Sequence, residues 1–398
     1  MKGKGFVIWF FEDSQYSALE VTRTAPPISK KEWLPFMSFR KIGPALINSR
    51  EVNQENLSAT LQNNINRYSM RYSLGGMLVA HSLAGPTSTG IYTPALLLSE
   101  LQGLALQSYE GSRCNSGFIF YSQPQEHFEQ IEKAGFQVER FDGNVHLEPG
   151  FFSSTISHRY VDGRNSFYIV DNHRRIYGIA TVKRPGDFSL YDRAMFRHVN
   201  GILDTTNGRM FSAFVGRNAD VVIYSKGKAM YRWSKLSWKI VDMDMIYDIL
   251  KSETYLSDGE TEALLSALMV CSDLRFGTLV LVLSGSNIPS FIGKIDKSDL
   301  STHIFKVNEQ RKISDIVSSG AAFGILTSDG MTTVSMDGEV VSSGDILDLA
   351  TDKTIRYEGG GRTQAAQVAS YFGLAIKVSE DGPLSLFKNG EKIAEFVI

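Results

Sequence analysis

The sequence predicts an α/β protein of more than one domain. Strand, helix and strand patterns follow one another at 115–121, 125–134 and 135–140, an alternation typical of a small α/β unit. The 398 residues exceed the roughly 250–300 that one hydrophobic core serves. Because the pattern changes twice along the chain, we expect three domains: an α/β module at 1–150, a β-rich sensor or scaffold module at 151–250, and a third domain at 251–398.

Composition and charge are those of an ordinary soluble globular protein. Hydrophobic residues make up 43% and charged residues 21% of the chain, so neither disorder nor a fibre is indicated. The formal net charge is −2, so no global field attracts nucleic acid, and any anion site must be local. The apolar run at 5–11 is too short for a signal-peptide core or a membrane span. We therefore expect a cytoplasmic protein that has no membrane segment and does not favour nucleic acid.

The first module is predicted to mix helices and strands. A buried strand is expected at 5–11, an amphipathic helix at 53–72 and a second helix at 93–107. The segment 74–84 is rich in glycine and small residues and carries no predicted helix or strand. No metal site is expected in this module, because its histidines lack the spacing of metal ligands; they are His81, His127 and His146.

The middle module is predicted to be β-rich. The run 166–182 has the pattern of a hairpin with Asp171-Asn172 at its turn, and further strand patterns follow at 209–216, 219–233 and 237–242. Its basic and aromatic residues would suit a surface on which a nucleotide or a single strand stacks, but we expect the commoner arrangement, solvated turns over an aromatic core. The residues concerned are Arg174, Arg175, Arg217, Lys226, Lys228, Tyr231, Arg232, Trp233 and Trp238.

The third domain is predicted to begin with a capped helix. After a short helix at 243–250, Ser257 and Glu260 form a capping-box pattern ahead of an apolar helical face, and the strand-like run 277–285 comes next. The chain has two cysteines, Cys114 and Cys271, which lie far apart in the sequence. We expect both to be small buried side chains.

Three short motifs follow in this domain. Asp329-Gly330 comes after the strand-like run 324–328, whose end it is predicted to mark. The glycine triplet 359–361 precedes Arg362 and a helical run, so backbone N–H groups and a planar guanidinium are expected at a helix start, where phosphates bind. Ser379-Glu380 closes a third strand-like run. The three motifs together have the layout of a phosphate site.

These motifs resemble those of the diadenylate cyclase (DAC) domain, the family that includes the N-terminal domain of the DNA-integrity scanning protein. The family marks its active site with Asp-Gly-Ala after a strand, Arg-His-Arg-Ala-Ala at a helix start and a strand-ending Ser-Glu. This chain has at those places Asp329-Gly330-Met331, Arg362-Thr363-Gln364-Ala365-Ala366 and Ser379-Glu380. The resemblance covers 257–391 and implies a mixed β-sheet flanked by helices. Thr363 and Gln364 depart from it, because neutral groups replace an imidazole and a cation.

The resemblance implies that the domain condenses two ATP molecules into cyclic di-AMP and pyrophosphate, with Mg²⁺ or Mn²⁺ as cofactor. It makes Asp329 and Arg362 catalytic, and Asp329 and Glu380 metal ligands. It assigns the nucleotide contacts to Gly330, Met331, Gly360, Gly361, Arg362, Thr363, Gln364, Ser379 and Glu380. Because each domain holds one ATP, an active protein is expected to be a homo-oligomer in which cyclase domains face each other.

Three functions stay open at this point. The two retained carboxylates favour a diadenylate cyclase whose N-terminal region is regulatory. The departures at Thr363 and Gln364 favour a weak or inactive DAC-fold sensor that binds a nucleotide or cyclic dinucleotide. The third is another nucleotide-handling enzyme with a different acceptor. Each has ATP or an adenine dinucleotide as its partner, and Arg362 rather than Lys377 is expected on the phosphate.

Overall fold

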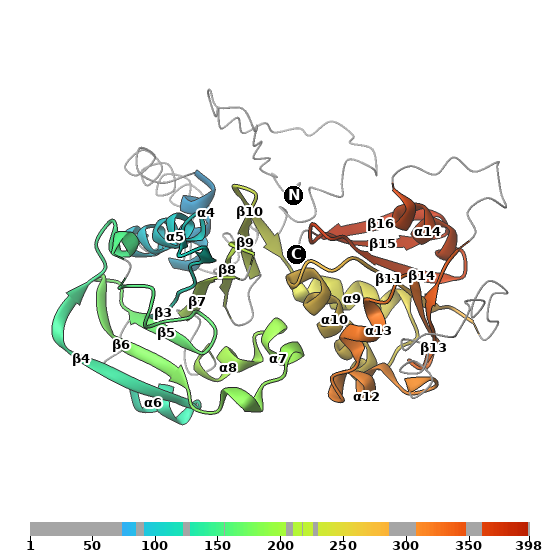
Figure 1. Cartoon of the computed structure of the whole chain (residues 1–398), viewed down its shortest axis with the longest axis horizontal. Coiled ribbons are helices and arrows are strands. Elements are labelled where there is room, and N and C mark those ends of the chain that lie inside the picture. The colour runs from blue at the N-terminus through green and yellow to red at the C-terminus, as the bar shows by residue number, and fades with distance from the viewer. Residues whose placement is uncertain are drawn as a thin grey trace, which may run out of the picture.

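The computed structural model describes residues 74–84, 91–121, 128–154, 156–203, 210–216, 218–225, 230–285, 308–347 and 360–396. The elements predicted at 5–11 and 53–72, and His127, lie outside these ranges. The described residues form two lobes, each built on a mixed β-sheet with helices on both faces, which confirms the predicted α/β class (Figure 1). No helix in the described part of the chain is long and apolar enough to cross a bilayer.

The N-terminal lobe is built on an eight-stranded sheet in the order β10-β9-β8-β7-β3-β5-β6-β4. Only β3 and β5 pair in parallel among these strands. Their bounds are β3 (Gly117–Tyr121), β4 (Phe136–His146), β5 (Ser166–Val170), β6 (Arg175–Val182), β7 (Met210–Val215), β8 (Val221–Tyr224), β9 (Met230–Ser234) and β10 (Ser237–Val241). The predicted hairpin is present as β5 and β6. The sheet takes strands from both sides of residue 150, where a domain boundary is predicted.

Helices cover both faces of this sheet. On one face lie α4 (Leu74–Ala84) and α5 (Tyr92–Ala105), and on the other lie α6 (Phe128–Lys133) and α8 (Arg197–Leu203). The helix predicted at 93–107 is thus α5. The segment 74–84, for which the sequence predicted no helix or strand, forms α4. A Cβ atom on Gly75 would lie 3.0 Å from Cδ1 of Trp238, so glycine lets α4 approach β10 closely.

Of the six basic and aromatic residues of the middle module that the structure describes, three are buried in the core, and Arg174, Arg175 and Trp238 are partly buried. Tyr231, Arg232 and Trp233 retain only 3%, 3% and 7% of their exposure, which leaves no stacking surface on β9. Arg217, Lys226 and Lys228 lie outside the described residues. Both cysteines are buried and reduced, and burial raises the pKa of Cys271 to about 12.

The C-terminal lobe has a six-stranded sheet in the order β13-β12-β11-β14-β15-β16. Only β11 and β12 are parallel to each other in this sheet. The strands are β11 (Thr278–Leu283), β12 (Met331–Val334), β13 (Val340–Asp345), β14 (Gly373–Val378), β15 (Leu384–Lys388) and β16 (Glu391–Phe396). Helix α14 (Gly361–Ala369) packs on one face, while α10 (Asp258–Asp273) and α13 (Ala322–Leu326) pack on the other.

Two local predictions in this lobe differ in part from the structure. The residues predicted as a strand at 324–328 belong mostly to α13, because Ala322, Ile325 and Leu326 are buried at helical spacing. At α10, the Ser257 hydroxyl accepts from the N–H of Glu260 at 3.3 Å, as predicted. The Glu260 carboxylate does not return to Ser257. It accepts from the N–H and hydroxyl of Ser314, at 2.9 and 2.6 Å, and so ties α10 to α12 (Ile313–Ser318).

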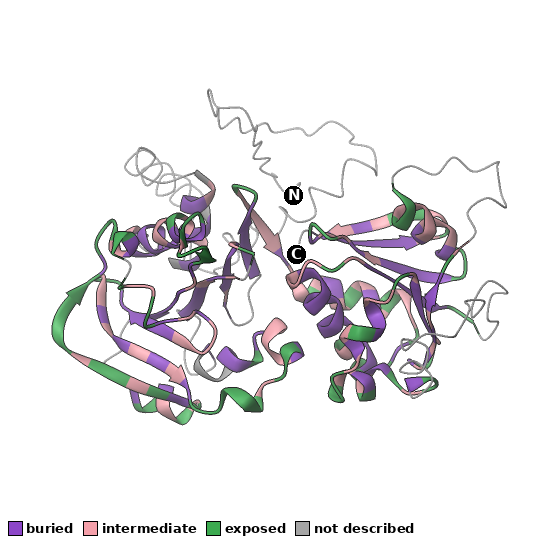
Figure 2. Cartoon of the chain, viewed as in Figure 1, coloured by how far each residue is buried: buried purple, intermediate pink, exposed green. Residues whose placement is uncertain are grey.

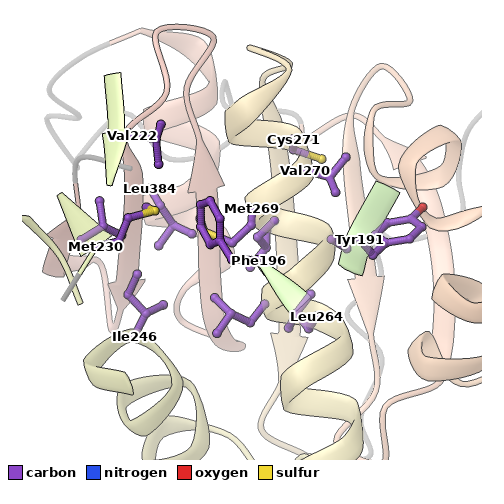
Figure 3. Packing of buried hydrophobic residues seen from close by; sticks show 14 of the residues in the cluster. Tyr191, Phe196, Val222, Met230, Ile246, Leu264, Met269, Val270, Cys271 and Leu384 are labelled. Atoms are coloured by element: carbon purple, nitrogen blue, oxygen red, sulfur yellow. The ribbon is translucent and has the colours of Figure 1, made fainter. Parts of the chain in front are cut away.

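One continuous apolar core joins the two lobes. Leu264, Met269 and Val270 on α10 and Leu384 on β15 belong to the same buried cluster as Val222 of β8, Met230 of β9 and Phe196 (Figure 3). The contact is extended by α9 (Met243–Glu253), through Ile246 and Leu250, and by α7 (Leu190–Ala194), through Tyr191. Figure 2 shows buried stretches of ribbon on both sides of the place where the lobes meet. The lobes therefore form one packed body in the described residues.

Candidate functional site

The ends of three central strands bring the predicted motifs to one edge of the C-terminal sheet. The register pairs Leu279 of β11 with Met331 of β12, and Thr278 of β11 with Val378 of β14. Asp329 lies two residues before Met331, and Glu380 lies two residues after Val378. Because β14 runs antiparallel to β11 and β12, the start of the first two strands and the end of the third share this edge. These strand directions bring the Asp329-Gly330 and Ser379-Glu380 motifs, which are far apart in the sequence, to the same edge of the sheet.

The first residues of α14 return to this same edge. Helix α14 leads through a short turn into β14, so its beginning lies beside the end of β14. Gly360 is the N-cap residue, with extended backbone at φ −77° and ψ 171°, and no side chain caps the helix there. A Cβ atom on Gly360 or Gly361 would meet nothing within 4 Å. The helix start therefore presents backbone N–H groups at an open surface, which suits an anion.

An ion pair joins two of the motifs at this edge. Nη1 of Arg362 lies 2.6 Å from Oε1 of Glu380, and the two side chains are 47% and 70% exposed. The ion pair lies over Gly277, the residue that precedes β11. A Cβ atom on Gly277 would lie 2.2 Å from Nη1 of Arg362 and 3.1 Å from Cγ of Glu380. Glycine at position 277 is thus what lets the guanidinium lie there. The sequence indicated Gly277 only as the first residue of a strand-like run.

Asp329 and Gly330 form the turn that leads into β12, rather than the end of a strand. The Asp329 side chain is exposed, and it makes no hydrogen bond or ion pair with another described residue. Gly330 has φ +115°, and a Cβ atom there would lie 2.5 Å from the carbonyl carbon of Gly344. The approach of β13 therefore requires glycine at position 330, and the predicted nucleotide contact of Gly330 stays a prediction. Met331 is 1% exposed and belongs to the apolar cluster beneath α14, with β11 paired to one side of it and β13 to the other.

The neutral residues of the helix motif have a cationic neighbour. Nζ of Lys377, on β14, donates to Oγ1 of Thr363 at 2.8 Å. Burial lowers the pKa of Lys377. Thr363 and Gln364 are both partly buried. The sequence placed only Arg362 on the phosphate, yet Lys377 is the single charged residue in the run 373–378, a signal that could have marked it.

The loop that carries Glu380 is held by the other lobe. Ser379 begins a turn in which the N–H of Gly382 donates to its carbonyl at 2.8 Å. Lys235, between β9 and β10, lies 3.2 Å from the carboxylate of Asp381. Arg275, between α10 and β11, donates to the carbonyl oxygen of Asp381. The neighbour of Glu380 in the sequence is therefore anchored from both sides.

A buried ion-pair network supports Arg275. The carboxylate of Asp220, which is 4% exposed, accepts from Arg275 and from the buried Arg232, each at 2.7 Å. Arg232 also lies 3.4 Å from Asp273 at the end of α10. Since removing one partner of a buried pair leaves an uncompensated charge, these residues fix the corner between α10 and β11 relative to β8 and β9. None of these partnerships was foreseen from the sequence.

A second contact from the N-terminal lobe reaches the segment ahead of Asp329. The hydroxyl of Tyr191, on α7, accepts from the N–H of Phe323 at 2.9 Å and donates to the carbonyl of Gly320 at 3.4 Å. Phe323 lies in α13, which leads directly to the turn containing Asp329. The N-terminal lobe thus contacts the Glu380 loop at Asp381, and it contacts the start of the helix that precedes the Asp329 turn.

The donors at the site fit a divalent ion only together with ligand oxygens. No group of three or more His, Cys, Asp or Glu side chains suited to a metal occurs among the residues that the structure describes. Asp329 offers an exposed carboxylate, and Glu380 is engaged by Arg362. Mg²⁺ is commonly held by one or two carboxylates plus substrate phosphates, with water completing the shell. The residues present therefore suit an ion that is bound together with a phosphate compound.

Comparisons with known proteins give only weak likenesses. No family model and no curated protein matches the chain. Among solved structures, it is similar to a hypothetical membrane spanning protein from Bacillus cereus, at 20% identity over 35% of this chain and 64% of that chain, with a TM-score of 0.27. It is also similar to a double mutant of DacA from Staphylococcus aureus, at 16% identity over 34% of this chain and 85% of that chain, with a TM-score of 0.23. At these TM-scores the likenesses carry no argument about this chain.

Proposed function

We propose that the C-terminal lobe is a DAC-like nucleotide-binding unit that condenses two ATP molecules into cyclic di-AMP and pyrophosphate. The observation that carries this proposal is the meeting of the three motifs at one sheet edge, where Arg362, Glu380 and the open start of α14 lie beside the turn of Asp329. An exposed carboxylate, a guanidinium and backbone N–H groups are the groups that a phosphate ester needs. The resemblance of the motifs to the DAC family supplies the reaction.

The chemistry assigns a role to each group. The 3′-hydroxyl of each ribose attacks the α-phosphate of the other ATP; in each of the two steps a P–O bond forms, the bond to the β-phosphate breaks, and one pyrophosphate leaves. In this proposal Asp329 accepts the hydroxyl proton, and Arg362 and the first N–H groups of α14 stabilise charge on the phosphate oxygens. A divalent ion bound with the phosphates would supply further charge neutralisation. Two such lobes must face each other for the two nucleotides to meet.

The N-terminal lobe has a regulatory role in this proposal. Three contacts support this role. Lys235 pairs with the carboxylate of Asp381, next to Glu380, and Asp220 pairs with Arg275, which donates to the Asp381 carbonyl. Tyr191 accepts from the first turn of the helix ahead of Asp329. A change in the packing of β9 or α7 therefore has a short route to both carboxylates.

A second candidate function is a DAC-fold sensor without turnover. One observation favours it: Glu380 neutralises Arg362, and Thr363 and Gln364 add no charge in the first turn of α14. Removal of one donor at developing charge lowers a rate by about 10²–10³. A site with these neutral residues would retain binding better than catalysis.

The decisive experiment is incubation of the full chain with ATP and Mg²⁺ or Mn²⁺, followed by mass analysis of the products. Cyclic di-AMP together with pyrophosphate is the result expected of the cyclase. Calorimetry with ATP, ADP and cyclic di-AMP decides the rest: binding without product supports the sensor. No heat with any of the three at about millimolar ligand would overturn both functions.

A further inference from the structure

Lys377 is placed differently from the other lysines on the C-terminal sheet. It lies two residues after Ala375 on β14 and so faces α14, on the side of the sheet that carries Ala366 and Leu279. Its amine reaches the first turn of α14, where it donates to Oγ1 of Thr363 at 2.8 Å. Lys388 and Lys392, by contrast, lie within 2.6 Å of Glu253 and Glu395 respectively.

The surroundings leave the Lys377 charge incompletely matched. An ammonium group has three donors, and the neutral Thr363 hydroxyl accepts only one of them. Two acidic groups act on Lys377, and both have other partners: Glu395 is shared with Lys392 and the hydroxyl of Ser385, and Asp381 pairs with Lys235. Because Lys377 is partly buried, its charge acts through a lower effective dielectric than that of a surface lysine. Burial also lowers its pKa, which indicates that the described residues do not fully stabilise the ammonium form.

The candidate phosphate site needs another cation. A triphosphate carries several negative charges, whereas Arg362 is already paired with Glu380, and the next two residues of α14 are neutral. Of the cations on this face of the sheet, Lys377 is the one hydrogen-bonded to that helix turn. Oγ1 of Thr363 therefore holds the amine beside the N–H groups of the helix start.

We propose that Lys377 is a phosphate-binding residue of the site, supplying from β14 the second positive charge that the start of α14 lacks. The inference rests on the proposed function for the identity of the nucleotide, but not for the anion. A polyphosphate lying over the first turn of α14 would take Nζ of Lys377 from Thr363 and accept from Arg362 on its other side. The site then selects for polyphosphate chains over monophosphates.

The test is calorimetry on the full chain with ATP, ADP, AMP and inorganic tripolyphosphate. Lys377→Met removes the charge and keeps much of the length, Lys377→Arg restores a cation, and Lys388→Met is the matched control. Lys388 is also partly buried, but it lies at the end of β15 that is away from the candidate site. We expect Lys377→Met to weaken ATP and tripolyphosphate by about 10-fold or more and AMP by much less. Lys377→Arg should recover most of the loss, and Lys388→Met should leave all four affinities unchanged.

The outcomes separate the two proposals. Equal losses of affinity for AMP and ATP, or no loss at all, would overturn the role of Lys377. A purely structural defect would weaken both ligands alike, whatever their number of phosphate groups. If tripolyphosphate binds in a Lys377-dependent manner while no adenine nucleotide binds better than it, the role of Lys377 stands and the nucleotide function falls. If the parent chain binds neither, both are wrong.

Discussion

Replacement of Gly277 by alanine tests whether the guanidinium of Arg362 belongs to the ligand site. The new Cβ atom would lie 2.2 Å from Nη1 and 2.9 Å from Cζ of Arg362, whereas ordinary contact begins near 3.4 Å. The guanidinium must therefore retreat by about 1 Å or more, since overlap of this size is not tolerated. The displaced group is the tip of a flexible side chain, so the backbone can keep its path. The change thus moves one functional group and little else.

The structure sets the size of both expected effects. The Arg362–Glu380 pair is 47% and 70% exposed, and exposed pairs contribute about 0–1 kcal/mol to the free energy of unfolding. Alanine in place of an unstrained glycine stabilises a protein by about 0.4–1 kcal/mol, because it reduces the conformational entropy of the unfolded chain. The two effects oppose each other, so the free energy of unfolding should change by less than about 1 kcal/mol. A charge-assisted hydrogen bond contributes about 1.5–3 kcal/mol, so ATP affinity should fall by about 10- to 150-fold if Arg362 binds phosphate.

The assay is a double-mutant cycle by calorimetry, with thermal unfolding alongside. Gly277→Ala should weaken ATP binding no more than Arg362→Ala does, and adding it to Arg362→Ala should change nothing further, because the group it displaces is gone. Gly103→Ala, where a Cβ atom meets nothing within 4 Å, is the control. Unchanged ATP affinity in Gly277→Ala, or additive losses in the double variant, would refute the placement of phosphate at Arg362.

Further expectations concern catalysis, assembly and stability. Asp329→Asn should abolish cyclic di-AMP while sparing much of the ATP affinity; product formed at the parental rate, measured by mass spectrometry, would remove Asp329 from the mechanism. Product formation should be second order in protomer at low concentration, because two lobes must meet; a first-order dependence down to the detection limit would contradict facing lobes as separate protomers. Gly330→Ala should lower the melting temperature clearly, in contrast to Gly277→Ala, since its φ of +115° and the 2.5 Å approach to Gly344 leave no room. His198 should make folding acid-sensitive: burial lowers its pKa from 6.5 to about 4, so the unfolded chain binds the proton first. Stability present above pH 6.5 should then be lost by about 3 kcal/mol as pH falls towards 4, and a urea titration in which His198→Gln keeps that pH dependence would contradict this.

The sequence predicted best what short-range pattern controls. Ser257 with an apolar helical face predicted α10, and the glycine triplet before Arg362 predicted α14, because caps and periodicity act within a few residues. The run 324–328 was ambiguous, since a short apolar segment suits a strand or a helix equally. Its contacts with α10 and β11 decide for α13. Likewise, the close approach of α4 to Trp238 overrides the low helix propensity of Gly75.

The sequence indicated the motif residues of the candidate site but not the residues that contact them. Its motif residues were marked by type and spacing, and strand direction then brings them to one edge. Their partners were not: Gly277, Lys235 and Tyr191 act through contacts between segments far apart in the chain. Lys377 could have been noticed in the sequence, because a lysine within an apolar strand is rarely buried without a polar partner. Without knowledge of the strand pairing, however, Thr363 could not be identified as that partner.

The shared apolar core limits how the two lobes can communicate. A protein whose lobes hang on a linker can relay a signal by opening and closing about a hinge, with little change inside either part. Here Leu384 and Met269 are packed against Val222 and Met230, so the lobes cannot swing apart without exposing that surface. If the N-terminal lobe regulates the site as proposed, a signal that arrives at its sheet must act by repacking side chains within a close-packed interior. Such repacking favours a small number of discrete arrangements over a graded motion.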